Sequence, residues 1–142
     1  MTEKEELLEL FAHKLRFVEQ KPSYAAIAAV QPLQFRDLAQ AAVFGAQNLA
    51  KQTGHLPQTA ELILFQIPGK GIAEILASLA EIAALEDLSA TNAALNGRLI
   101  LLDDILFQAA DEVKQLEILA EIFYPKFFAF GYEGTAWAKL HI

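Results

Sequence analysis

Histidines are the first residues to test for chemistry, because catalysis or metal binding in a chain without cysteine would most often use them. His13, His55 and His141 lie far apart along the chain. Glu9 and His13 are four residues apart, whereas di-metal sites in helix bundles use Glu and His three apart on each of two helices. We therefore interpret Glu9 and His13 as an ordinary surface pair and expect no metal site.

Acidic side chains gather in the second half of the chain. Residues 71–121 hold ten carboxylates against two cations, Arg98 and Lys114. Glu117 and Glu121 share one face of a predicted helix and could chelate a hard cation or act as an acid/base pair, but the sequence places no partner beside them. A solvated acidic face is the simpler interpretation, and it either raises solubility or attracts a basic partner.

Motifs for nucleophilic or phosphate chemistry are weak. The turn from Pro68 to Gly71 resembles an anion-binding turn before a helix, but it lacks the Lys-Ser/Thr ending of a phosphate loop. No serine lies in a Gly-x-Ser-x-Gly motif, and the chain has no cysteine. These observations predict a protein that is not an enzyme and uses no cofactor.

Charge and hydropathy exclude some partners and locations. The formal net charge of −7 disfavours nucleic acid, because counterion release from phosphates requires cationic side chains. Adhesion to an anionic membrane is disfavoured for the same reason. The start of the chain is acidic and amphipathic, and no apolar run reaches the roughly 18 residues of a membrane span. We therefore expect a cytoplasmic protein.

Apolar residues recur at helical spacing through most of the chain. Thr2 and Glu5 have the spacing of a capping box. The pattern predicts helices over about residues 3–20, 22–30, 34–52, 72–88 and 98–124. Residues 59–67 are ambiguous, since Leu62 to Phe65 fits a short buried strand as well as a helix, and we predict helix there.

The segment from Arg98 to Tyr124 has the clearest pattern. Its apolar residues form a heptad seam that is widened on both sides, which is typical of a buried central helix. Asp111 is placed to restart the helix after a break near Ala109. The predicted fold is all-α, a single domain over residues 1–142 built as a bundle of about five to seven helices around a buried central helix.

Half of the fourteen aromatic residues fall in the last twenty residues of the chain. The preferred interpretation is a tail that folds back and closes the core. The alternative is an anchor cluster for a partner or for a second copy of the chain.

The function predicted from these features is a non-enzymatic protein-binding module, in particular an acidic inhibitor or immunity-type protein that neutralises a basic protein partner. One alternative is a self-associating structural or regulatory protein that forms a homodimer. Another is an enzyme or a binder of small apolar ligands with an internal pocket. The residues predicted to contact a partner are Glu81, Asp103, Asp104, Asp111, Glu117, Glu121, Phe127, Phe128 and Trp137.

Overall fold

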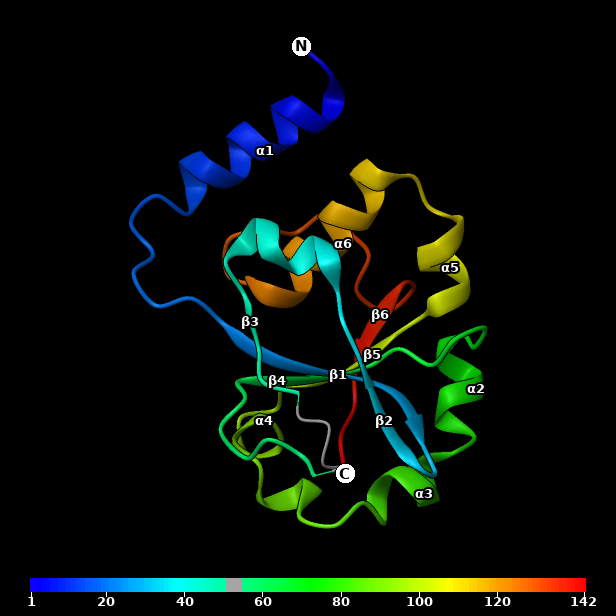
Figure 1. Ribbon diagram of the computed structural model, residues 1–142. Coiled ribbons are helices and arrows are strands. Elements are labelled where there is room, and N and C mark those ends of the chain that lie inside the picture. The colour runs from blue at the N-terminus through cyan, green and yellow to red at the C-terminus, as the bar shows by residue number, and fades with distance from the viewer. Residues whose placement is uncertain (51–54) are drawn as a thin grey trace.

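The computed structural model describes residues 1–50 and 55–142. Within them, six strands form one mixed sheet that lies between two layers of helices (Figure 1). The strand order across the sheet is β2-β1-β4-β5-β6, and β3 pairs with β1 beside this path. The prediction of an all-α bundle around a central helix is therefore wrong, and the chain has an α/β fold.

The bounds of the elements are as follows. The strands are β1 (Ser23–Val30), β2 (Leu33–Arg36), β3 (Gln47–Asn48), β4 (Leu62–Phe65), β5 (Leu99–Leu102) and β6 (Trp137–Lys139). The α-helices are α1 (Glu3–Lys14), α2 (Ile72–Leu76), α3 (Leu79–Ala83), α4 (Asn92–Leu95), α5 (Asp104–Ala109) and α6 (Glu112–Phe123). Two 3₁₀ helices are η1 (Ala39–Phe44) and η2 (Leu88–Ala90).

The centre of the sheet consists of β1, β4 and β5, which run parallel to one another. All four residues of β4 and all four of β5 are buried. Leu62 and Leu64 face one core cluster, whereas Ile63 and Phe65 face the other. A strand covered on both faces needs apolar residues at every position, so it loses the alternation that usually identifies a strand. Residues 99–102 therefore resembled the start of a buried helix.

Strand β1 replaces the helix predicted over residues 22–30. Its alanines favour helix locally, but Ala25 and Ala26 are fully buried in the sheet. Burial in the sheet determines the strand conformation of this segment. The difference in intrinsic propensity between helix and strand is smaller than the free energy gained by burying these side chains. The single helix predicted over 34–52 is likewise wrong, since β2, η1 and β3 occupy its described part.

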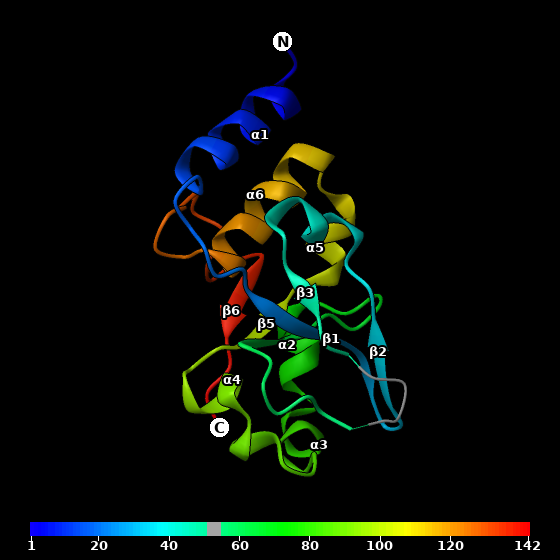
Figure 2. The same ribbon diagram turned by 60° about the vertical axis from the view of Figure 1, so that its left-hand side comes forward.

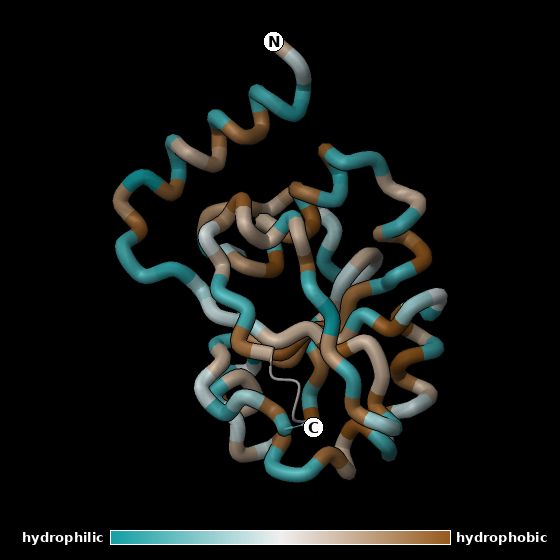
Figure 3. The backbone as a smooth tube through the Cα atoms, viewed as in Figure 1, coloured by the Kyte–Doolittle hydropathy of each residue, from teal (hydrophilic) through white to brown (hydrophobic). Residues whose placement is uncertain are grey.

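The two helical layers cover opposite faces of the sheet (Figure 2). On one face α1, η1, α6 and the tail share a core that includes Phe11, Phe44 and Trp137. On the other face α2, α3 and α4 pack over a second core that includes Ile75 and Ile82. Apolar residues accordingly concentrate in the sheet, while α1 alternates between hydrophobic and hydrophilic residues (Figure 3). The sheet therefore separates the two apolar cores and positions the helices on both of its faces.

Several local predictions are confirmed. The Thr2 side chain accepts a hydrogen bond from the amide of Glu5 at 3.1 Å and caps α1. The predicted break falls between α5 and α6, and Asp111 caps α6 through the amide of Lys114 at 2.9 Å. Phe128 and Trp137 are buried, as the interpretation of the tail as a core element predicts.

Candidate functional site

Three parallel strands place their carboxyl ends at one edge of the sheet. Ligands of open α/β sheets bind outside this edge. Gln66 directly follows β4, and Asp103 and Asp104 directly follow β5. Arg36 is the last residue of β2, which runs antiparallel to β1, and its Nη1 donates to the carbonyl of Gln66 at 3.1 Å. The edge thus collects polar side chains from three strands.

The carboxylate of Asp104 is the centre of this polar cluster and is 5% exposed. It accepts hydrogen bonds from Gln66 Nε2 at 2.8 Å, from the amide of Gly69 at 2.7 Å and from Gln108 Nε2 at 3.2 Å. Arg36 Nη1 lies 3.7 Å from Asp104 Oδ1. The buried carboxylate of Asp104 therefore connects side chains from β2, from the end of β4 and from α5.

Two opposing effects set the pKa of Asp104. Burial raises it, because the charged form loses hydration. The hydrogen bonds from Gly69, Gln108 and Gln66 and the positive charge of Arg36 lower it by more, so the pKa lies below the ordinary value of 3.8. The carboxylate is consequently ionised at neutral pH.

The loop that follows β4 is held by acidic side chains of the chain itself. Asp103 accepts from the amides of Ile72 at 3.2 Å and Leu106 at 2.9 Å, while Glu74 accepts from the amide of Gly71 at 3.2 Å. A Cβ atom at Gly71 would lie only 2.9 Å from Asp103 Oδ2. With the Gly69 amide bound to Asp104, the amides that an external phosphate would need are already used. The glycine-rich turn is structural.

A pocket of about 320 Å³ opens beside this loop at the ends of β1 and β4. Its apolar wall comes from the sheet, the loop and helices α2 and α3. Its polar groups are one ammonium, one carboxylate, one hydroxyl and one amide. The lining residues are Ala29, Val30, Gln31, Ile67, Lys70, Ile75, Ser78, Glu81 and Ile82.

Gln66 is the most deeply buried polar residue at this edge, with no exposed surface. Its Nε2 donates to Asp104, but its Oε1 is buried without a hydrogen-bond partner. Buried acceptors without a partner are uncommon in native proteins. The amide oxygen therefore leaves one unfilled hydrogen-bonding position behind the loop.

The carboxylates predicted to form one partner-binding face are separated by the sheet. Glu81 is exposed on α3, which covers one face, and it lines the edge pocket. Asp111 is exposed at the N-cap of α6, which covers the other face. Asp103 and Asp104 lie at the carboxyl edge and hold the loop. A continuous acidic surface from these residues does not exist.

Glu121 is buried inside the molecule rather than on a solvated face. It is 3% exposed and accepts hydrogen bonds from the amides of Phe130, Gly131 at 2.7 Å and Tyr132 at 3.2 Å. Trp137 Nε1 donates to the same carboxylate at 2.9 Å. Glu121 therefore fixes the tail against α6.

The remaining predicted residues are Glu117, Phe127 and Phe128. Glu117 Oε1 accepts a hydrogen bond from the hydroxyl group of Tyr132 at 3.0 Å. Burial and the nearby carboxylates, Glu117 foremost, raise the pKa of Tyr132 to about 12. Phe128 is buried and Phe127 is 42% exposed. Most of the aromatic cluster therefore belongs to the core.

Sequence reasoning did not identify Arg36, Gln66 and Lys70 as site residues. A usable signal existed, because polar residues directly follow two short apolar runs, at Gln66 and at Asp103. In parallel strands those positions meet at one edge. The signal was missed because both runs were assigned to helices.

Metal-binding clusters and membrane-spanning helices are both absent from the part of the chain that the structure describes. No group of three or more His, Asp or Glu side chains there is placed to hold a metal ion. None of the helices formed by residues 1–50 and 55–142 is both long and apolar enough to cross a bilayer.

No protein-family model and no curated protein matches the sequence. Solved structures match the fold. A periplasmic heme binding protein from Pseudomonas aeruginosa is 18% identical, with a TM-score of 0.65 over 99% of this chain and 55% of that one. S. aureus IsdE complexed with heme is 14% identical, with a TM-score of 0.66 over 84% and 54%. An ABC transporter substrate-binding protein from Listeria monocytogenes is 14% identical, with a TM-score of 0.63 over 87% and 56%.

These comparisons correct further predictions. The chain has the fold of half of such binding proteins, since it spans about half the length of each. The predicted immunity-type module and its basic protein partner are wrong, because they rested on a helical bundle with one acidic face. The predicted cytoplasmic location conflicts with neighbours that are periplasmic. The expectation that the protein is not an enzyme agrees with the same neighbours, whose names describe binding proteins.

Proposed function

We propose that this chain binds a small organic solute at the carboxyl edge of its parallel strands. The observation that carries the proposal is the pocket of about 320 Å³ beside the loop after β4. Its position agrees with the general location of ligand sites in open α/β sheets, and its volume falls within the range of about 300–1,000 Å³ typical of ligand pockets. The fold shared with solute-binding proteins supports the same function.

The lining of the pocket indicates the chemistry of the solute. Lys70 offers a cation to an anionic group, and Glu81 accepts hydrogen bonds from a donor such as an ammonium group. Ile67, Ile75 and Ile82 provide an apolar wall between these polar groups. A zwitterion with a short apolar side chain, such as an aliphatic amino acid, has all three features.

Heme fits this pocket poorly, although two of the structural neighbours bind heme. The side chains that usually bind heme iron are His, Met, Cys and Tyr. The described residues that line the pocket include none of these four types. The proposed solute is therefore not heme.

The pocket is prepared by the buried cluster behind it. Asp104 holds Gly69 and Asp103 holds Ile72, so both ends of the short loop carrying Lys70 are fixed. A fixed loop loses less conformational entropy on binding than a mobile one. The pocket is partly open to solvent, so we expect this chain alone to bind its solute with a Kd of about 0.1 to 1 mM.

Saturation-transfer NMR with L-leucine, its deaminated acid 4-methylpentanoate and its decarboxylated amine 3-methylbutylamine tests the proposal. We expect leucine to bind more tightly than either single-charge analogue. Lys70→Met and Glu81→Gln should each weaken leucine binding by about fivefold or more, because each removes one charged contact.

Lys114→Met and Glu133→Gln are matched controls, since they remove exposed charges away from the pocket. Both should leave leucine binding unchanged. Equal binding of leucine to the wild type, Lys70→Met and Glu81→Gln, or no binding to the wild type, would overturn the proposal.

A further inference from the structure

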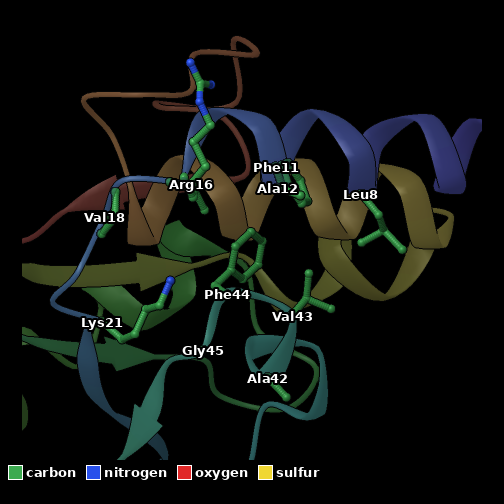
Figure 4. A pocket seen from close by; sticks show the side chains of 11 residues that line it. Leu8, Phe11, Ala12, Arg16, Val18, Lys21, Ala42, Val43, Phe44 and Gly45 are labelled. Carbon is green, nitrogen blue, oxygen red and sulfur yellow. The ribbon is translucent and has the colours of Figure 1, made fainter.

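A second hollow lies on the opposite side of the molecule from the edge pocket's helices, between α1 and η1. It is a groove of about 700 Å³. In Figure 4, Phe44 lies near its middle, Leu8 and Val43 lie toward one end, and Lys21 lies toward the other. The lining residues are Leu8, Phe11, Ala12, Leu15, Arg16, Val18, Lys21, Ala42, Val43, Phe44 and Gly45. We name this the α1–η1 groove.

The floor of the α1–η1 groove belongs to the core. Phe11 and Phe44 are 3% and 2% exposed, and their ring centroids are 5.1 Å apart. The ring centroid of Phe128 also lies 5.1 Å from that of Phe11. Close-packed aromatic rings give a stiff apolar surface. At the rim, Val43 remains 44% exposed.

The charges of the groove oppose the charge of the chain. Its two charged lining residues, Arg16 and Lys21, are both cations, although the chain carries a net charge of −7. Arg16 already contacts the ring of Phe17 and the carbonyl of His13. Among the described residues, Lys21 forms no ion pair.

The backbone of η1 fixes the stem of Lys21. Gly45 ends η1 with a φ of +67°, and a Cβ atom there would lie 3.2 Å from Lys21 Cδ. Because Gly45 has no side chain, the Lys21 stem can pack directly on the backbone and carry its ammonium group to the end of the groove. The apolar floor and the cation are therefore built into one site.

We propose that the α1–η1 groove binds an amphipathic anion, specifically a medium-chain fatty carboxylate. The acyl chain would lie over Phe44 toward Leu8 and Val43, and the carboxylate would meet Lys21. A small monoanion is favoured over a second copy of the chain, because the copy would bring its own net charge of −7. An anionic membrane is disfavoured by the same repulsion.

Displacement of the fluorescent sulfonate 1-anilinonaphthalene-8-sulfonate tests this inference. Below its micellar concentration, dodecanoate should displace the probe from the wild type, whereas dodecyltrimethylammonium of the same chain length should displace it at least fivefold less well. Lys21→Met keeps the stem but removes the charge, so dodecanoate binding should weaken by about threefold to fivefold.

Position 43 provides a matched pair of variants at an exposed site. Val43→Glu places a carboxylate in the groove and should weaken dodecanoate binding by about tenfold, whereas Val43→Lys should not weaken it. Lys70→Met, in the edge pocket, should leave dodecanoate binding unchanged, so failure of one site is distinguishable from failure of the other.

Two outcomes would overturn the inference. One is equal displacement by dodecanoate and dodecyltrimethylammonium, which would mean that the groove does not select the anionic head group. The other is a dimer in sedimentation velocity that Val43→Glu dissociates, which would assign the groove to a contact between two copies of the chain.

Discussion

Replacement of Glu121 by glutamine is expected to destabilise the fold by about 3 to 5 kcal/mol. The carboxylate is buried and accepts from three backbone amides and from Trp137 Nε1. Glutamine keeps the shape but removes the charge, and it turns one acceptor oxygen into a donor that faces other donors. The loss therefore combines weaker hydrogen bonds with an unsatisfied buried group.

Urea unfolding followed by the fluorescence of Trp137, the chain's single tryptophan, measures this effect. The matched control is Glu112→Gln on the same helix, whose carboxylate pairs with Lys4 at 2.8 Å on the surface. An exposed pair contributes about 1 kcal/mol or less. Similar stability losses for Glu121→Gln and Glu112→Gln would contradict the buried role of Glu121.

Replacement of Asp104 by asparagine is expected to cost about 2 to 4 kcal/mol at neutral pH. The side chain would keep its size but lose the charge that attracts Arg36 and strengthens the hydrogen bonds from Gln66 and Gly69. The loop after β4 should become more mobile when these contacts weaken. We therefore also expect Asp104→Asn to weaken solute binding at the edge pocket.

The stability lost in Asp104→Asn depends on pH through the pKa of Asp104, which folding lowers below 3.8. The native state then binds its proton less readily than the unfolded state, so the stabilisation is present above the unfolded pKa and disappears as pH falls through the folded pKa. Urea unfolding should show the wild type and Asp104→Asn converging below about pH 4.

The control for this titration is Asp111→Asn, at an exposed N-cap where asparagine serves as well as aspartate. It should change stability little at any pH. A difference between the wild type and Asp104→Asn that stays constant from neutral to acid pH would show that the ionised carboxylate is not the source of the stability.

Local signals along the chain predicted the ends of helices better than the fold. The cap at Thr2 and the restart at Asp111 depend on side chains and amides a few residues apart, which the sequence contains. The sheet depends on contacts between distant segments, such as Ile63 with Leu99. A run such as Leu99 to Leu102 has no alternation, so it resembles one turn of a buried helix as closely as a buried strand.

The error in fold class carried through to the site. A single helix over residues 98–124 would carry Asp103, Asp104, Glu117 and Glu121, and the prediction grouped them with Glu81 and Asp111 as one set of partner-binding carboxylates. In the structure β5 ends at Leu102 and α5 begins at Asp104, so residues 98–124 do not form one helix. The four carboxylates therefore make separate contacts. What the sequence could have indicated is the pair of polar positions after the two apolar runs, at Gln66 and Asp103.

The most direct test of a solute site at the carboxyl edge is a ¹⁵N–¹H correlation spectrum of the protein with and without saturating L-leucine. The proposed site predicts amide shifts concentrated at the residues that line the edge pocket, which are Ala29, Val30, Gln31, Ile67, Lys70, Ile75, Ser78, Glu81 and Ile82. Shifts concentrated instead at Glu61, Asn96 and Arg98, which line a polar pocket at the amino ends of β4 and β5, would contradict it.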